Sequence, residues 1–140
     1  MCAFAFGGTN KAEQTISKAS SDTASEVLHG VGFEGRYEDL EGGYTVGFET
    51  FADDVDFTPR LKGLPTDSCR APHWGYVVEG RLTYRIGEHE AEIEGGEGFY
   101  VPAGHTLFAE AGSEVIFFSP TREWKQTVAK IAKEPEAVLA

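Results

Sequence analysis

Closely spaced turn signals divide the middle of the chain into short extended segments. Glycine turns fall at Gly80, at Gly87 and at Gly95–Gly98. Between the first two turns, Leu82, Tyr84 and Ile86 share one face and alternate with polar residues. A period of two over such short runs is typical of β-strands with one buried face, because a helix needs a longer uninterrupted segment. The pattern therefore predicts an all-β fold built from hairpins.

The flanking segments extend this prediction at both ends. Residues 44–51 alternate as a strand, and we expect in-facing aromatic residues to line any central pocket: Phe48, Phe99 and Phe108. From Pro120 onward, Trp124, Val128 and Ile131 recur at intervals of four and three, which indicates a helix capped by Thr121. We expect this helix on the barrel exterior or at a subunit contact, with Trp124 and its stripe as candidate contact residues.

Length and composition indicate one domain in three parts. A chain of 140 residues and 15.2 kDa is long enough for one core. Residues 1–26 are polar and rich in Ser and Thr, and are predicted to be a flexible N-terminal arm. Residues 27–119 are predicted to form the β-barrel, and residues 120–140 the C-terminal helix and tail.

The charge and the cysteine content exclude several classes of protein. A net charge of −11 disfavours nucleic acid and anionic membrane surfaces, because both are bound through clustered Lys and Arg. The chain contains neither an apolar run long enough to span a membrane nor a secretory signal pattern at its start. Only Cys2 and Cys69 are present, so a disulfide framework is not expected. A cytoplasmic protein is predicted, in which Cys69 stays a thiol available to a metal.

Four residues could ligate a metal. Cys69 and His73 are four positions apart, and Asp67 has the same parity, so an extended strand would project all three from one face. His105 follows a Pro102-x-Gly104 turn, from which a second strand could bring it beside the first group. Thiolate and imidazole together favour zinc, while iron, nickel or manganese are alternatives. The alternative without a metal is a buried free Cys beside a hydrogen-bonded His.

The segment from residue 67 to 111 resembles the two-motif core of the cupin superfamily. Tyr76-Val-Val-Glu-Gly80 matches the Tyr-Val-Leu-x-Gly of the first motif, and Gly87 closes that motif. This alignment places the motif's Glu on His73, its second His on Cys69 and its first His on Asp67. In the second motif Gly96, Pro102 and Gly104 match, the expected His falls on Leu107 and the Asn on Ala111, and His105 lies two residues before that His position. The pattern is similar to a variant small single-domain cupin with Cys and His in place of the usual His-x-His and Glu.

The resemblance implies a fold and a class of function. The expected fold is a cupin or jelly-roll barrel, a double-stranded β-helix, with one short C-terminal α-helix. The expected function is to bind or act on a small organic molecule at a metal centre in the barrel. The alternative is a non-enzymatic barrel that senses a ligand, a metal or the redox state. The family also implies a homodimer. His29 and His89 lie outside the motifs and are interpreted as ordinary surface residues.

Overall fold

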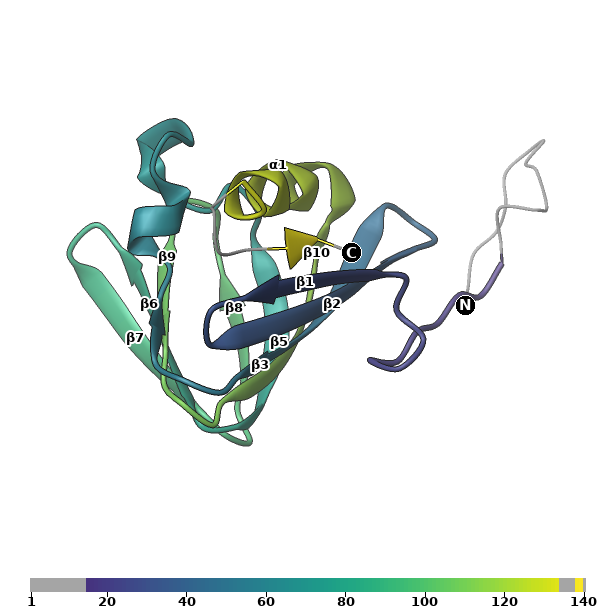
Figure 1. The fold of residues 1–140 in the computed structure, drawn as a ribbon, viewed down its shortest axis with the longest axis horizontal. Helices are drawn as coiled ribbons and strands as arrows, with labels where there is room; N and C mark the ends of the chain where they lie inside the picture. Colours follow the sequence, from purple (N-terminus) through teal and green to yellow (C-terminus); the bar gives the residue numbers. More distant parts are fainter. Residues whose placement is uncertain (1–14, 134–137, 140) are drawn as a thin grey trace, which may run out of the picture.

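The computed structural model describes residues 15–133 and 138–139, and within them two antiparallel sheets and one α-helix (Figure 1). The larger sheet has the strand order β11-β1-β2-β3-β10-β5-β8, and the smaller has β4-β9-β6-β7. The strands are β1 (Glu26–Gly30), β2 (Phe33–Leu40), β3 (Tyr44–Phe51), β4 (Val55–Asp56), β5 (His73–Glu79), β6 (Arg81–Ile86), β7 (His89–Glu94), β8 (Gly98–Val101), β9 (Thr106–Ala109), β10 (Glu114–Pro120) and β11 (Val138–Leu139). Short 3-10 turns η2 (Thr58–Leu61) and η3 (Pro65–Asp67) precede β5, and α1 (Thr121–Ile131) follows β10. The predicted jelly roll with a C-terminal helix is confirmed.

The two sheets face each other across one apolar core. Within the larger sheet, Gly47 on β3 lies between Tyr37 on β2 and Phe117 on β10, and a Cβ at Gly47 would collide with both rings. Both rings are fully buried, and their centroids are 6.4 Å apart. A glycine on β3 thus leaves the space that two large aromatic side chains fill.

The inner face of β3 is the opposite of the one predicted. Glu49 and Phe51 are buried, whereas Phe48 is only half-buried and borders a groove on the outside of the sheet. Phe108 is likewise exposed, and Phe99 packs partly buried against the ring of Tyr84 at 5.4 Å. The expectation that Phe48, Phe99 and Phe108 line the central pocket is wrong, because its aromatic lining consists of Phe57, Tyr84, Phe117 and Trp124. The strand itself is confirmed, but hydrophobicity alone does not predict a glutamate that faces inward.

Helix α1 closes one end of the core rather than lying on the exterior (Figure 1). Its buried face consists of Trp124, Thr127, Val128 and Ile131. The indole of Trp124 is 4% exposed and lies 5.2 Å from the rings of both Tyr37 and Phe117. Trp124 is therefore a core residue and not a subunit contact, which corrects the prediction from the helical stripe. The homodimer itself stays a prediction.

The start of α1 also differs from the prediction. Pro120 is the N-cap residue, and no side chain caps the helix. The Thr121 hydroxyl instead shares a hydrogen bond of 2.8 Å with the Thr45 hydroxyl on β3. The helix is thus tied to the sheet at its first turn.

The residues just before β1 are hydrogen-bonded to the C-terminal end of β2 and to the residue that follows it. The Ser25 amide donates to Glu38, and the Ser17 hydroxyl accepts from the Glu41 amide, both at 2.8 Å. The first described strand, β1, begins at Glu26. Residues 1–14 of the predicted arm lie outside the described residues. Among the described residues, no helix is long and apolar enough to cross a membrane.

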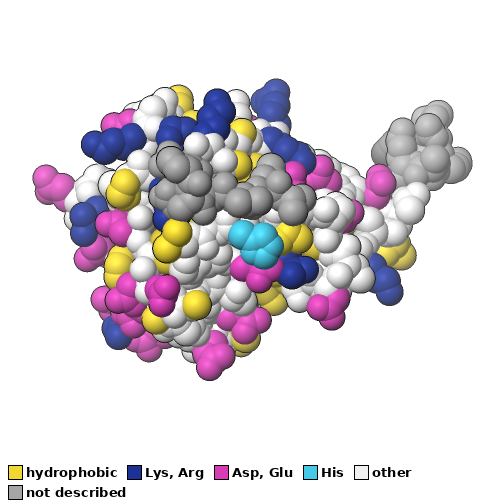
Figure 2. Space-filling view, in the orientation of Figure 1, with side chains coloured by type: hydrophobic (Ala, Val, Ile, Leu, Met, Phe, Trp, Pro, Cys, Tyr) yellow, Lys and Arg dark blue, Asp and Glu magenta, His cyan; other side chains and the backbone are white. Residues whose placement is uncertain are grey.

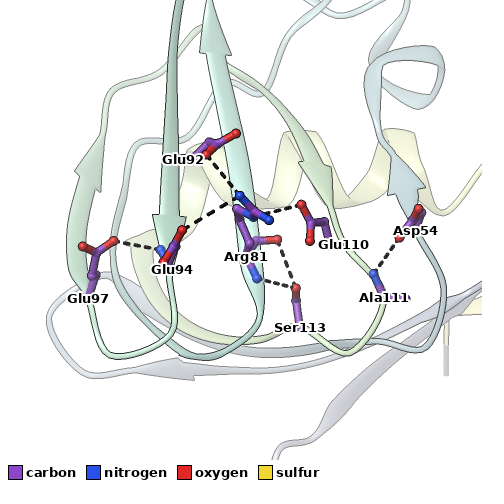
Figure 3. A network of polar contacts seen from close by, with 8 residues as sticks. All are labelled: Asp54, Arg81, Glu92, Glu94, Glu97, Glu110, Ala111 and Ser113. Atoms are coloured by element: carbon purple, nitrogen blue, oxygen red, sulfur yellow. Dashed lines mark hydrogen bonds and ion pairs between the residues drawn. The ribbon is translucent and has the colours of Figure 1, made fainter.

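The acidic surface gathers over the smaller sheet, at the lower left of Figure 2. There Arg81 binds three glutamates, from β7 and from the end of β9 (Figure 3). The carboxylates are Glu92 at 3.3 Å, Glu94 at 3.9 Å and Glu110 at 2.9 Å. The Ser113 hydroxyl accepts from the Arg81 amide and donates to its carbonyl, so the turn at Gly80 is fixed from both sides. These pairs are exposed, and each contributes little to stability on its own.

The two tryptophans allow a matched test of the role of α1. Trp124→Ala removes a buried indole between two rings and should lower the free energy of unfolding by about 3–5 kcal/mol. Trp74→Ala removes an indole that is 43% exposed and should cost about 1 kcal/mol or less. Urea denaturation of both variants measures the difference. Equal losses would contradict the assignment of Trp124 to the core.

Candidate metal centre

Backbone pairing between two loops brings the candidate ligands together. Cys69 and His105 are opposite each other in an isolated antiparallel bridge, with the Cys69 amide donating to the His105 carbonyl at 2.9 Å. The Gly104 amide in turn donates to the Cys69 carbonyl at 2.8 Å, and Gly104 has a φ of +98° that glycine adopts readily. His73 enters from the first position of β5. Three side chains from three segments therefore converge.

The three side chains form one compact buried group. The Cys69 Sγ and one ring nitrogen from each of His73 and His105 lie within 4.8 Å of one another. Their exposed fractions are 4%, 5% and 2%, and Cys69 Sγ lies 3.8 Å from His73 Nε2. These separations suit donors that share one central ion, since such donors lie farther from each other than from the ion. Among the described residues this is the one such group of His, Cys, Asp and Glu.

Neighbouring groups orient both imidazoles. His105 Nδ1 lies 2.8 Å from the Pro102 carbonyl, which can only accept, so Nδ1 carries the proton and Nε2 presents its lone pair. His73 Nδ1 makes a short hydrogen bond with the buried Ser119 hydroxyl, and its Nε2 faces Cys69. Such hydrogen bonds on the far nitrogen are the usual support of a histidine metal ligand. The donor set therefore fits a transition metal.

Asp67 is not brought into this group. It lies in η3, where the chain turns instead of running as the extended strand on which the parity argument relied. Its φ is +51°, and its Oδ1 accepts a hydrogen bond of 2.9 Å from the Gly63 amide. Asp67 is exposed and acts in this structure as a turn residue. His29 is exposed on β1, and His89 is exposed at the start of β7.

The sequence reasoning missed Glu49, which lines the same cavity. Its side chain enters from β3, and the Tyr37 hydroxyl donates to its Oε2 at 2.7 Å. The cavity has a volume of about 40 Å³. Its lining consists of Glu49, Phe57, Leu61, Cys69, His73, Tyr84, His105, Leu107, Phe117, Trp124, Thr127 and Ile131. One sequence signal could have revealed Glu49. On the paired strands β2 and β3, Gly35 lies opposite Glu49 and Gly47 lies opposite Tyr37, so each small residue leaves space for a large one.

Burial controls the electrostatics of the cavity. It raises the pKa of the Cys69 thiol to about 11 and the pKa of Glu49 to about 7, the latter against the opposing effect of the Tyr37 hydrogen bond. It lowers the pKa of His105 to about 4, and the pKa of His73 falls well below its usual value through burial and the neighbouring His105. In the metal-free protein at neutral pH, Cys69 is a thiol and both imidazoles are neutral. A cation must displace the thiol proton to gain a thiolate ligand.

Comparison with solved structures places the fold. A protein of unknown function from Rhizobium leguminosarum bv. viciae 3841 is 19% identical over 76% of this chain and 97% of that chain, with a TM-score of 0.54. The polyketide cyclase RemF from Streptomyces resistomycificus is 10% identical over 76% of this chain and 80% of that chain, with a TM-score of 0.50. An RmlC-like cupin from Shewanella frigidimarina NCIMB 400 is 16% identical over 85% and 95% of the two chains, with a TM-score of 0.46.

These likenesses concern the fold alone, because every identity is low. The fold is the two-sheet jelly roll that the sequence predicts, and it is shared with the Rhizobium protein and with RemF. Neither a protein-family model nor a curated protein sequence matches the chain. The chemistry of the centre therefore has to be argued from its own residues.

The raised pKa of Glu49 predicts a pH-dependent stability. A group whose pKa rises on folding stabilises the protein fully below its unfolded pKa, and this contribution is lost as the pH rises through the folded value. Relative to Glu49→Gln, metal-free wild type should therefore lose about 3 kcal/mol between pH 4.5 and 7. The lowered pKa values of His73 and His105 make the stability of both proteins change with pH in the opposite direction. The difference between the two free energies of unfolding, measured by urea denaturation at each pH, cancels this shared trend. A constant difference across this range would contradict the buried location of the carboxylate.

Proposed function

We propose that this chain, which has the cupin fold, binds a divalent transition metal through Cys69, His73 and His105, and binds or acts on a small organic molecule beside it. The observation that carries the proposal is the convergence of three donor atoms within 4.8 Å in a buried pocket. The fixed Nδ1–H of His105 supports it, since Nε2 then faces the pocket as a base. Zinc suits a thiolate and two imidazoles best, with iron, nickel and manganese as alternatives.

The number of ligands favours a centre that is open to a further ligand. Structural zinc sites use four protein ligands, whereas catalytic sites use three and keep one position for water or substrate. Asp67, the fourth candidate from the sequence, is turned toward Gly63. The cation would supply Lewis acidity at the remaining position, and the chain's own residues exclude bulk water and limit the size of the ligand.

The location of Cys69 favours a ligand site over a redox sensor. Redox-sensing cysteines are accessible and have a low pKa, because the thiolate is the species that reacts with peroxide. Cys69 is 4% exposed, so the core limits the access of an oxidant to its sulfur. The sensing alternative therefore lacks support from the thiol itself.

Substitution of each candidate ligand should rank the side chains by metal content. Cys69→Ala and His73→Ala should abolish stoichiometric zinc, and His105→Ala should weaken zinc binding by at least about tenfold, because each removes one of three donors. Asp67→Ala should retain zinc, since its carboxylate is held by Gly63. Elemental analysis after dialysis measures the zinc content per chain.

The two exposed histidines supply matched controls. His29→Ala and His89→Ala should keep full zinc content. Retention of zinc by Cys69→Ala together with its loss from His89→Ala would overturn the ligand assignment. Circular dichroism of every variant separates loss of a ligand from loss of the fold.

Treatment with peroxide separates the proposal from the sensing alternative. The zinc-loaded protein should keep its zinc after brief exposure to millimolar hydrogen peroxide, because the sulfur is shielded by the core. A zinc-release assay with a chromogenic chelator gives the measurement. Stoichiometric release at the same rate as thiol oxidation would favour the sensor.

A further inference from the structure

Two polar groups of the cavity have no role in the proposed ligand set. One is the carboxylate of Glu49, which is 8% exposed. The other is the indole Nε1–H of Trp124, which is buried and has no hydrogen-bond partner within the described part of the chain. Both residues line the same cavity as Cys69, His73 and His105. Buried polar groups are normally satisfied, so a cavity that keeps an acceptor and an unpaired donor is suited to a polar ligand.

We propose that Glu49 is the proton acceptor of this centre, and that the cavity takes a small neutral molecule with an ionisable proton. This inference rests on the proposed metal site. In the step, the bond between the ligand heteroatom and its hydrogen breaks, the proton passes to a Glu49 carboxylate oxygen, and the electron pair stays on the heteroatom. The charge of the resulting anion is balanced by the cation. No oxidant or reductant is needed.

The geometry separates Glu49 from the metal ligands. Its oxygens do not belong to the group of donors within 4.8 Å of one another, although it lines the same cavity. The Tyr37 hydroxyl holds Oε2 from the side of β2, and no other side chain of the described residues forms a hydrogen bond with the carboxylate. A carboxylate fixed near the ligand position but outside the coordination shell is placed to accept a proton.

The charges around Glu49 favour proton uptake. None of the described residues that line the cavity is Lys or Arg, so no cation of the chain neutralises the carboxylate there. The titratable groups that face it are Tyr37, Cys69 and Tyr84, together with the neutral imidazoles of the centre. The phenol of Tyr37 is buried with the carboxylate and remains protonated, because burial and Glu49 both raise its pKa. An isolated buried carboxylate is stabilised by gaining a proton.

Size limits the ligand class. A volume of about 40 Å³ accommodates a ligand of only a few heavy atoms. The unpaired indole N–H of Trp124 adds a donor for a heteroatom of that ligand. The ligand class is therefore a small protic molecule such as a short alcohol or a thiol, and a bulky acid is excluded.

Azide binding to the cobalt(II)-loaded protein tests this inference. Azide is a small linear anion, and its binding together with a proton on Glu49 is equivalent to the binding of neutral hydrazoic acid. The visible absorption of cobalt(II) reports the binding. In wild type the azide affinity should fall about tenfold per pH unit above the pKa of Glu49, because the carboxylate must then take up a proton. In Glu49→Gln the affinity should be independent of pH over the same range and at least about tenfold tighter at pH 8.

Tyr37→Phe is the matched variant. It keeps the ring and removes the hydroxyl that stabilises the Glu49 anion, so the pKa of Glu49 rises and the inflection of the azide titration should move to higher pH. A merely structural role of the Tyr37–Glu49 pair would lower the stability of both variants without moving this inflection. Glu79→Gln, on the exposed end of β5, should behave as wild type.

The outcomes separate this inference from the metal site on which it rests. If Glu49→Gln takes up cobalt fully and its azide affinity changes with pH as in wild type, Glu49 is not the proton acceptor. The metal site is unaffected by that outcome. Loss of cobalt from Glu49→Gln would identify Glu49 as a ligand and also overturn the inference. A wild-type protein that takes up no cobalt would overturn the proposed function, and this inference with it.

Discussion

The candidate centre depends on the backbone pairing of Cys69 with His105. Neither residue lies in a long strand, yet two hydrogen bonds, from the Cys69 amide and the Gly104 amide, hold the segment before β5 against the segment before β9. These segments lead into different sheets, since β5 belongs to the larger and β9 to the smaller. The bridge therefore fixes the sulfur and the imidazole where the two sheets meet. Because the backbone sets this distance, the donors are in place before any ion binds.

The sequence predicted the fold better than it predicted the walls of the cavity. Glycine turns and alternation are local signals, and they identified the hairpins and the class of fold. Cys69 and His73 were grouped by their even spacing and His105 by the Pro-x-Gly turn before it, and the structure brings these three side chains together. Asp67 was grouped with them by strand parity, but Pro65 opens a 3-10 turn there, and parity has no meaning in a turn. Glu49 was missed because a charged residue in an alternating strand is ordinarily on the solvent face.

Long-range packing decides the features that local patterns do not determine. Glu49 can face inward because β2 supplies the Tyr37 hydroxyl, and the two residues are twelve apart in sequence. Helix α1 was correctly expected as a helix, but its position over the open end of the sheets depends on how Trp124 packs with Tyr37 and Phe117. The same helix supplies Trp124, Thr127 and Ile131 to the cavity. A helix expected on the exterior is thus a wall of the candidate centre.

The total charge of the buried cavity connects the metal site with the proton acceptor. In the metal-free protein the cavity avoids charge, because burial favours the neutral forms of Cys69, His73 and His105 and raises the pKa of Glu49. A divalent cation would reverse this preference, since a thiolate and one carboxylate together balance two positive charges. An anionic ligand would add a third negative charge, which protonation of Glu49 removes. A cavity of this kind would keep its net charge near zero by moving one proton, and Glu49 is suited to accept this proton because it lies outside the proposed set of metal ligands.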